Sequence, residues 1–413
     1  MGELISVADA RERILKHFSP TAPIRKPLSE IYQYVLAEAI YAREDLPAFA
    51  NSAMDGYAVR SEDMIKATSD NPVVLKVIGD IPAGHWFENT VSSGTAVRVM
   101  TGAPIPDGSN AVVPIEYCQA LGFAPETSLP TRVQVMLSVQ SGEFIRPKGQ
   151  DVRTGELILP KGLRLRPQDI GMLAMLGFNE VFVYQKPRIA VFSSGDELIQ
   201  IGASRISSKI YDSNSPMLDA LIQNYGGTVV SLGVIPDRFD AVQAALDEAV
   251  RLDVDLILST AGVSVGSYDY VRAVIEKHGE ASIWRVNMRP GKPLLMGRYK
   301  DVPFIGLPGN PVSAFVGFEV FVHPVLFHLQ GIIDWKRPVI RSLIDEPIES
   351  DGRESYFRAQ VRMEEGKWHC HLAGHQGSGN LFALVQASAL LLIPSGVKYL
   401  PIGSEVETWL LSD

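Results

Sequence analysis

The strongest constraint on the fold is a strand–loop–helix alternation that begins after Lys186 and continues to about Leu329. Its apolar, strand-length runs are Arg188–Phe192, Thr228–Gly233, Val254–Ser259 and Pro303–Leu307. Helical patterns lie between or after these runs, at Pro216–Gln223, Asp240–Arg251, Tyr268–Lys277 and Val312–Leu329. Alternation of this kind predicts a doubly wound parallel α/β sheet with both faces covered by helices.

The rest of the chain follows other patterns. Ser6–Asp9 is a capping box before an amphipathic helix, and a second helical pattern runs over Leu28–Glu38. From Asn51 onward short β-rich runs are separated by Gly and Pro clusters, and short strands return after Trp335. We expect a small helical and extended linker domain at 1–45 and 146–180, an inserted β-rich domain at 46–145, the α/β domain at 181–331 and a C-terminal β-barrel-like domain at 332–413.

Composition narrows the class of protein. A net charge of −9 over 413 residues disfavours nucleic acid, because its phosphates favour clustered Lys and Arg. No apolar run approaches the roughly 20 residues that cross a bilayer, and the N-terminal residues lack a signal-peptide pattern. Only Cys118 and Cys370 are present, which is typical of a reducing compartment. We expect a cytoplasmic protein that binds neither nucleic acid nor membrane.

Ligands of open α/β sheets bind outside the carboxyl ends of the strands, where the loops here carry Gly, acidic and hydroxyl residues. In Leu307–Pro311, Gly309 permits close backbone approach, Asn310 can cap and Pro311 suits the first helical position. A helix opened in this way favours phosphate. Taken alone, the loop is equally compatible with a well-made turn.

Two further loops carry cations. Arg289 and Lys292 flank a Pro-Gly turn, and Arg146 and Lys148 are arranged similarly before Asp151. Arg can hold an oxyanion with two parallel donors, whereas Lys acts as a point charge. A solvated loop is the alternative for each.

The candidate carboxylates could hold Mg²⁺ beside a phosphate-binding loop, since without a metal they would repel the phosphate. They are Asp55, Asp151, Glu197, Asp237 and Asp269. Each could instead be a cap or turn residue, and Asn51–Tyr57 could be a plain Asp-Gly hairpin turn. His369 and His371 fall on one face of a predicted strand without a second ligand pair, so we interpret them as structural. The residues alone thus predict an enzyme for a phosphate-bearing small molecule that uses Mg²⁺.

Eight short motifs occur in an order that resembles one family over essentially the whole chain. The stretches are Asn51–Val59, Arg98–Pro104 with Pro106–Gly108, Ile145–Asp151, Ser194–Leu198, Gly262–Gly266, Arg289–Pro293, Gly306–Ser313 and Gly374–Ser378. They resemble the molybdopterin molybdenumtransferases, whose animal relative is the E domain of gephyrin. The resemblance implies insertion of molybdate into the dithiolene of molybdopterin-AMP, with Mg²⁺ and hydrolytic release of AMP.

The resemblance also implies a homodimer of four-domain subunits, with a molybdopterin-binding-like α/β domain and a site formed between two subunits. The implied catalytic residues are Asp55, Thr101, Asp151, Glu197, Asp237 and Asp269, of which Glu197, Asp237 and Asp269 would place Mg²⁺ or the attacking water. The implied cofactor-binding residues are Ser264, Arg289, Lys292, Gly309, Asn310, Arg358 and Ser378. The adenylyltransferase that supplies the substrate and enzymes that accept the finished cofactor are implied partners.

Two positions depart from the family pattern. Ser267 stands where an acidic residue is frequent, and Ala261 stands where a second Gly is usual. We expect activity to persist, with altered metal or oxyanion dependence. The alternatives are the same chemistry with tungstate, a non-catalytic scaffold of the same fold, and the preceding adenylyl transfer.

Overall fold

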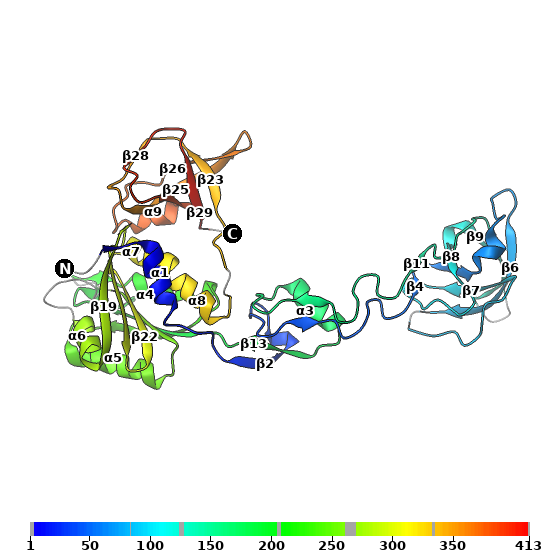
Figure 1. Cartoon of the computed structure of the whole chain (residues 1–413), viewed down its shortest axis with the longest axis horizontal. Coiled ribbons are helices and arrows are strands. Elements are labelled where there is room, and N and C mark those ends of the chain that lie inside the picture. Colours follow the sequence, from blue (N-terminus) through cyan, green and yellow to red (C-terminus); the bar gives the residue numbers. More distant parts are fainter. Residues whose placement is uncertain are drawn as a thin grey trace. The chain divides into compact units, whose positions relative to one another are not determined.

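The computed structural model describes residues 4–82, 84–123, 128–204, 208–260, 270–332 and 335–411. The chain divides into two compact units (Figure 1). One unit comprises residues 1–38, 161–171 and 178–413, and the other comprises residues 39–160 and 172–177.

The larger unit contains a seven-stranded sheet in the order β1-β19-β21-β22-β18-β14-β17. Its strands are β1 (Leu4–Ile5), β14 (Arg188–Ser194), β17 (Thr228–Ile235), β18 (Leu256–Thr260), β19 (Gly279–Val286), β21 (Pro293–Tyr299) and β22 (Val302–Leu307). The four strands predicted from the sequence pair in parallel, as β17-β14-β18-β22. Strand β21 is antiparallel to both β22 and β19, so the doubly wound α/β prediction is confirmed with a mixed edge.

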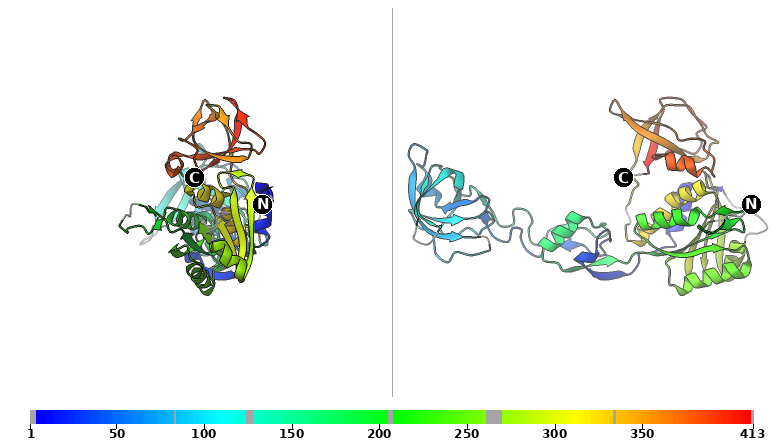
Figure 2. Two further views of the ribbon diagram at one scale, coloured as in Figure 1. Left: turned by 90° about the vertical axis from the view of Figure 1, so that its left-hand side faces the viewer. Right: turned by 180° about the vertical axis from the view of Figure 1, so that it is seen from behind.

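Helices cover both faces of this sheet (Figures 1 and 2). One face packs against α1 (Val7–Leu15), α4 (Asn214–Asn224), α7 (Pro311–Gly317) and α8 (His323–Leu329). The other face packs against α5 (Phe239–Arg251) and α6 (Tyr270–His278). Ser6 caps α1 by accepting from the backbone N–H of Asp9, as the capping box predicts.

A continuous helical stretch runs from Pro311 to Leu329 through a π-helical turn, η3 (Phe318–Val322). An 18-residue window of this 19-residue stretch has a mean hydropathy of 1.6, and it is the one helix among the described residues that is long and apolar enough to cross a membrane. However, 83% of it is buried inside the protein. It is therefore the core helix of the larger unit, mostly apolar because protein surrounds it.

The C-terminal residues form a closed five-stranded barrel, in the order β25-β26-β23-β29-β27 and back to β25. Its elements are β23 (Ile340–Ile344), β25 (Glu354–Glu364), β26 (Lys367–Leu372), α9 (Leu381–Gln386), β27 (Ala389–Ile393) and β29 (Glu405–Leu410). Strand β20 (Met288–Arg289), from the α/β part, pairs in parallel with the start of β25. The short strands β24 (Ile348–Glu349) and β28 (Tyr399–Leu400) pair beside the barrel. The predicted barrel-like domain is confirmed.

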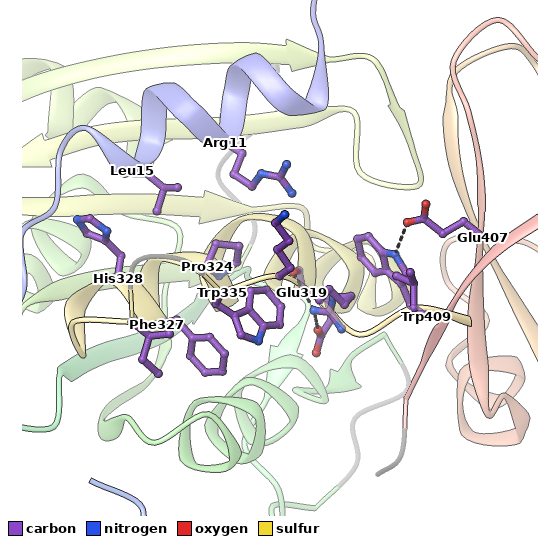
Figure 3. Close-up of a pocket in the computed structure, with 13 residues that line it drawn as sticks. Arg11, Leu15, Glu319, Pro324, Phe327, His328, Trp335, Glu407 and Trp409 are labelled. Carbon is purple, nitrogen blue, oxygen red and sulfur yellow. Dashed lines mark hydrogen bonds and ion pairs between the residues drawn. The ribbon is translucent and has the colours of Figure 1, made fainter. Parts of the chain in front are cut away.

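Arg337, between α8 and β23, joins the core helix to the barrel. It is ion-paired with Glu319, whose side chain is only 2% exposed, and donates to Nδ1 of His323 at 2.7 Å. Its guanidinium lies 4.5 Å from the Trp409 ring centroid on β29 and 5.5 Å from that of Trp335. Figure 3 shows Glu319, Trp335 and Trp409 around a pocket of about 400 Å³.

The smaller unit is built on a six-stranded sheet in the order β8-β5-β7-β6-β10-β9. Its strands are β5 (Gly56–Val59), β6 (Val73–Ile81), β7 (Thr95–Val99), β8 (Ala111–Pro114), β9 (Cys118–Phe123) and β10 (Pro130–Val135). The unit also contains two separate antiparallel pairs, β3 (Ile40–Tyr41) with β12 (Leu157–Leu159) and β4 (Asn51–Ser52) with β11 (Ile145–Arg146). The short helices are α2 (Ser61–Met64), η2 (Ile115–Tyr117) and part of α3 (Pro167–Met175).

The helix predicted over Leu28–Glu38 is wrong. Only the single turn η1 (Leu28–Glu30) is helical, and it follows β2 (Pro23–Pro27), which pairs with β13 (Glu180–Tyr184). Gln33 has a φ of 62°, which interrupts a right-handed helix. Val35 and Leu36 instead form bridges to Arg164 and Val183, so pairing with a distant segment overrides the local pattern.

Candidate active site

Asp55 and Thr101 lie together in the smaller unit although they are 46 residues apart in sequence. The backbone N–H and the hydroxyl of Thr101 both donate to Oδ1 of Asp55, at 2.6 and 2.8 Å. These two bonds, the backbone one first, hold the pKa of Asp55 below its ordinary 3.8. Both residues are exposed, so this corner presents an ionised, oriented carboxylate at the surface of the unit.

Asp151 is held at the same corner of the smaller unit. Nη2 of Arg146 donates to Oδ2 of Asp151 at 2.5 Å. Arg146 lies on β11, where it pairs with Asn51 on β4, the strand that precedes Asp55. Because the Arg146–Asp151 pair is about half exposed, we expect its energy to be small and its role to be orientation of the two side chains.

Glu197 and Asp237 follow two neighbouring strands of the larger unit. Strand β14 ends at Ser194, which pairs with Ile235 at the end of β17, so both acidic loops leave the same edge of the sheet. The backbone N–H of Asp237 donates to Oδ1 of Asp196 at 3.2 Å. Burial, together with the nearby charges of Asp196 and Glu197, raises the pKa of Asp237 above 3.8. Asp196, Glu197 and Asp237 therefore all follow strands that end at this edge.

Four sequence positions of interest, Ala261, Ser264, Ser267 and Asp269, lie outside the described residues. Within the described ranges, no three His, Cys, Asp or Glu side chains are grouped as metal ligands. The metal set of Glu197, Asp237 and Asp269 therefore stays a prediction.

Buried polar side chains support the loops at this edge of the sheet. Oγ of Ser193 is hydrogen-bonded to Oδ1 of Asp212 at 3.0 Å and to Oγ1 of Thr260 at 2.7 Å. Asp212 also accepts from the backbone N–H of Asn214 at the start of α4. Asn214 in turn donates to the carbonyl oxygen of Gly309 at 2.8 Å. The sequence pattern did not single out this network, which holds the Gly309 loop in place.

Asn310 stands at the N-cap position of α7, but its side chain makes no capping bond. Its Nδ2 instead donates to Oγ of Ser378, 68 residues away, at 3.1 Å. The backbone N–H of Val312 donates to the carbonyl oxygen of Ser378 at 3.2 Å. The capping role expected of the Asn310 side chain is therefore wrong, because a partner from the barrel takes its place.

A pocket of about 370 Å³ lies where the α/β part meets the barrel within the larger unit. It combines three cations with hydroxyl and amide groups. Its polar lining residues are Arg289, Lys292, Asn310, Ser313, Arg353, Gln376 and Ser378. Four of the sequence-predicted residues, Arg289, Lys292, Asn310 and Ser378, thus line one cavity. Arg353 was not anticipated, since Asp351-Gly352-Arg353 has the pattern of an ordinary turn.

Arg358 lies beneath this pocket and is only 1% exposed. Its Nη2 donates to the carbonyl oxygens of His375 and Gly377, both at 3.1 Å. Burial, and then the charge of Arg289, lowers the pKa of Arg358 to about 10. The side chain therefore supports the loop that carries Ser378.

Three sequence profiles match successive parts of the chain. They are the MoeA N-terminal region (domains I and II) over residues 5–177, the probable molybdopterin binding domain over 190–328 and the MoeA C-terminal region (domain IV) over 344–411. A molybdopterin molybdenumtransferase 2 of Mycobacterium tuberculosis is 36% identical over 412 residues, which cover 98% of this chain and 99% of that protein.

The chain belongs to the molybdopterin molybdenumtransferase family.

Other members of the family agree. The molybdopterin molybdenumtransferase of a Nostoc species is 35% identical over 379 residues, 90% of this chain and 85% of that protein. The crystal structure of a molybdopterin biosynthesis moeA protein from Pyrococcus horikoshii matches with a TM-score of 0.82 and 30% identity, covering 99% of this chain and 100% of that chain. The family resemblance predicted from the eight motifs is confirmed. The prediction that the chain is an enzyme of molybdenum-cofactor biosynthesis is confirmed as well.

Proposed function

We propose that this enzyme inserts molybdate into the dithiolene of adenylylated molybdopterin and releases AMP. The observation that carries the proposal is the pocket that Arg289, Lys292, Asn310 and Ser378 line together. Two cations with a hydroxyl and an amide suit a small tetrahedral oxyanion, which needs several donors around one centre. Membership of the family supports molybdate as that oxyanion.

Within this pocket the residues would have separate roles. Arg289 offers parallel donors, whereas Lys292 supplies a point charge. Ser378, held by Asn310, presents its hydroxyl at a fixed position. Lys292 and the backbone of Gly309 and Asn310 would hold phosphate of the substrate.

We assign Mg²⁺ to the carboxylates at the carboxyl edge of the sheet. Carboxylate oxygens are its preferred protein ligands, and Glu197 and Asp237 lie on neighbouring loops with Asp196 beside them. Burial first, and then the charges of Asp196 and Glu197, raise the pKa of Asp237, and a bound cation would offset both effects. Glu197 and Asp237 would hold Mg²⁺, which when bound would neutralise charge on the pyrophosphate.

Asp55, Thr101 and Asp151 belong to the other compact unit, and we place them in the same reaction through a homodimer. In this proposal the smaller unit of one subunit supplies the oriented Asp55 carboxylate to the larger unit of its partner. The bonds from Thr101 support a functional role, since they hold an exposed carboxylate ionised and directed.

The setting we propose is the cytoplasm. Both Cys118 and Cys370 are free thiols, as in a reducing compartment. The adenylyltransferase that makes the substrate and the enzymes that accept the cofactor would be transient partners.

The test is an assay of the full chain with molybdopterin-AMP, Mg²⁺ and either molybdate or tungstate, following AMP release and metal retained on the pterin. We expect molybdate-dependent AMP release, and at least a hundredfold loss (about 10²) in Glu197→Gln. Glu248→Gln, which alters an exposed carboxylate on α5 paired with Arg251, is the matched control and should retain full rate. Binding of the substrate without turnover for either ion would refute the proposal in favour of a scaffold, and preference for tungstate would refute its choice of oxyanion.

A further inference from the structure

Asp351 and Arg353 form a bonded pair at the rim of the oxyanion pocket. Nε of Arg353 donates to Oδ2 of Asp351 at 3.0 Å, and Nη2 donates to the same oxygen. The backbone N–H of Arg353 donates to Oδ1 at 3.1 Å. Hydrogen bonding from Arg353 is the largest cause that holds the pKa of Asp351 below 3.8. Asp351 is therefore an ionised, fully engaged partner.

The remaining guanidinium nitrogen of Arg353, Nη1, contacts the α/β part of the unit. Nη1 of Arg353 donates to the carbonyl oxygen of Met288, 65 residues away in sequence, at 3.0 Å. Met288 directly precedes Arg289, whose Nη1 lies 3.8 Å from Oδ2 of Asp351. The pairing of β20 with β25 runs through these same residues, Met288 with Glu354 and Arg289 with Ser355.

We infer that Asp351 and Arg353 are positioning residues that hold the Arg289–Lys292 loop against the barrel, in the geometry that lets the pocket take an oxyanion. The inference rests on the proposed function for the identity of the ligand. The mechanism is geometric: the planar guanidinium joins a carboxylate on one side to a backbone carbonyl on the other. A lysine ammonium keeps the charge but lacks this rigid fork.

A purely electrostatic role and a positioning role for this pair predict different oxyanion affinities in its variants. By charge alone, Arg353→Lys would leave oxyanion affinity unchanged, and Asp351→Asn would tighten it because a negative charge leaves the rim. If the pair positions the loop, both substitutions weaken binding. Because they break the same fork, combining them should add little to either single loss.

The experiment titrates molybdate into the full-length protein by calorimetry. We expect affinity to fall about tenfold in Arg353→Lys and about equally in Asp351→Asn, as when a supporting partner of a ligand-binding side chain is removed. The matched control is Arg362→Lys on β25, the strand that follows Arg353; its guanidinium pairs with Asp345 and Glu364, which do not line the pocket. This control should bind molybdate like the wild type. Circular dichroism and thermal melting of each variant establish that it is folded.

A second readout does not depend on the ligand. Hydrogen exchange followed by mass spectrometry should rise over residues 286–292 in both pair variants and stay unchanged in Arg362→Lys. If Arg353→Lys binds molybdate as tightly as the wild type with unchanged exchange, the inference is overturned. If the wild type binds no molybdate although exchange rises in the variants, the pair holds the loop but the proposed oxyanion site fails. If Asp351→Asn does not fold, Arg353→Lys alone decides.

Discussion

At the scale of single residues, the candidate carboxylates of the two units differ in what determines their ionisation. Asp55 is ionised because Thr101 donates two hydrogen bonds to it. Asp237 is ionised at a cost, since burial and two neighbouring carboxylates favour its protonated form. A carboxylate that is destabilised in the free protein is suited to a cation, because the bound charge relieves the repulsion.

The raised pKa of Asp237 predicts that lower pH has opposite effects on protein stability and on Mg²⁺ binding. Because its folded pKa is raised, Asp237 opposes folding above that pKa, and the penalty disappears as the pH falls below the unfolded value of 3.8. Mg²⁺ binding needs the carboxylate, so it weakens as the pH falls toward the raised pKa. Calorimetric titration of Mg²⁺ at about pH 7 and about pH 5 should show this loss in the wild type. Asp237→Asn should bind weakly at both values and melt at a higher temperature near neutral pH; a variant that melts lower there contradicts the argument.

Residue positions near the site could be predicted only where a local pattern marks them. Gly309, Asn310 and Lys292 stand in recognisable loops, and the structure places all three at the edge predicted for ligands. The orientation of Asn310 could not be predicted, because its partner is Ser378 in another domain. The roles of Asp351 and Arg353 could not be predicted from the sequence either, because Arg353 is held by the carbonyl oxygen of Met288, which is distant in sequence.

At the scale of elements, strands of the α/β part were predicted well from their apolar runs, both for the buried β14 and for the edge strand β17. The strand runs beginning at Arg188 and Thr228 agree with β14 and β17 at their first residues. Prediction failed for Leu28–Glu38, where bridges to distant segments decide the backbone. The sequence-based prediction was also incomplete at Gly56, because the local Asp-Gly pattern is equally typical of a hairpin turn.

Gly56 is a strand residue whose lack of a side chain is required by close packing. A Cβ at this position would lie 2.0 Å from the carbonyl oxygen of Val113 on the paired strand β8. Gly56→Ala should therefore destabilise the smaller unit by about 1–3 kcal/mol, because backbone must move to relieve the clash. Thermal unfolding of the full chain measures it. The control is Gly171→Ala on α3, where the added methyl meets nothing within 4 Å and should stabilise by about 0.5–1 kcal/mol.

The ion pair between Glu319 and Arg337 connects the core helix to the barrel. Tyr225 also donates to the Glu319 carboxylate, at 2.9 and 3.1 Å. Although burial alone would raise it, the neighbouring His323 and Arg337 lower the pKa of Glu319 below 4.5. The stabilisation is therefore present above that value and is lost as the pH falls through the lowered pKa.

Arg337→Met should cost about 3–5 kcal/mol of unfolding free energy, since it leaves a buried charge unpaired. Urea denaturation followed by tryptophan fluorescence reports on it directly, as Trp335 and Trp409 flank Arg337. Adding Glu319→Gln to Arg337→Met should recover part of the loss. Arg362→Met, which breaks a half-exposed pair, should change stability by only about 0–1 kcal/mol. Equal losses in the two single variants would exclude a special role for the buried pair.

At the scale of the whole molecule, the candidate residues are divided between two compact units. If one site uses both units from different subunits, inactive variants should complement each other. Equal amounts of Asp55→Asn and Glu197→Gln, mixed and allowed to exchange subunits, should regain about a quarter of wild-type activity. The reason is that half of the dimers are mixed, and each mixed dimer has one intact site. No recovery after verified exchange would place both residues in one chain.

The pairing of the chain's first strand has a consequence for its synthesis. Strand β1 at Leu4–Ile5 pairs with Arg285 and Val286, and Ile14 on α1 belongs to the core cluster that includes Phe318 and Val325. The smaller unit needs little beyond residue 160 and can fold early on the ribosome. At about 5–20 residues per second, the apolar face of α1 must wait tens of seconds for its partners to be translated. The nascent N-terminus is thus a natural client for chaperones, and codons that slow translation after residue 160 should raise aggregation rather than improve folding.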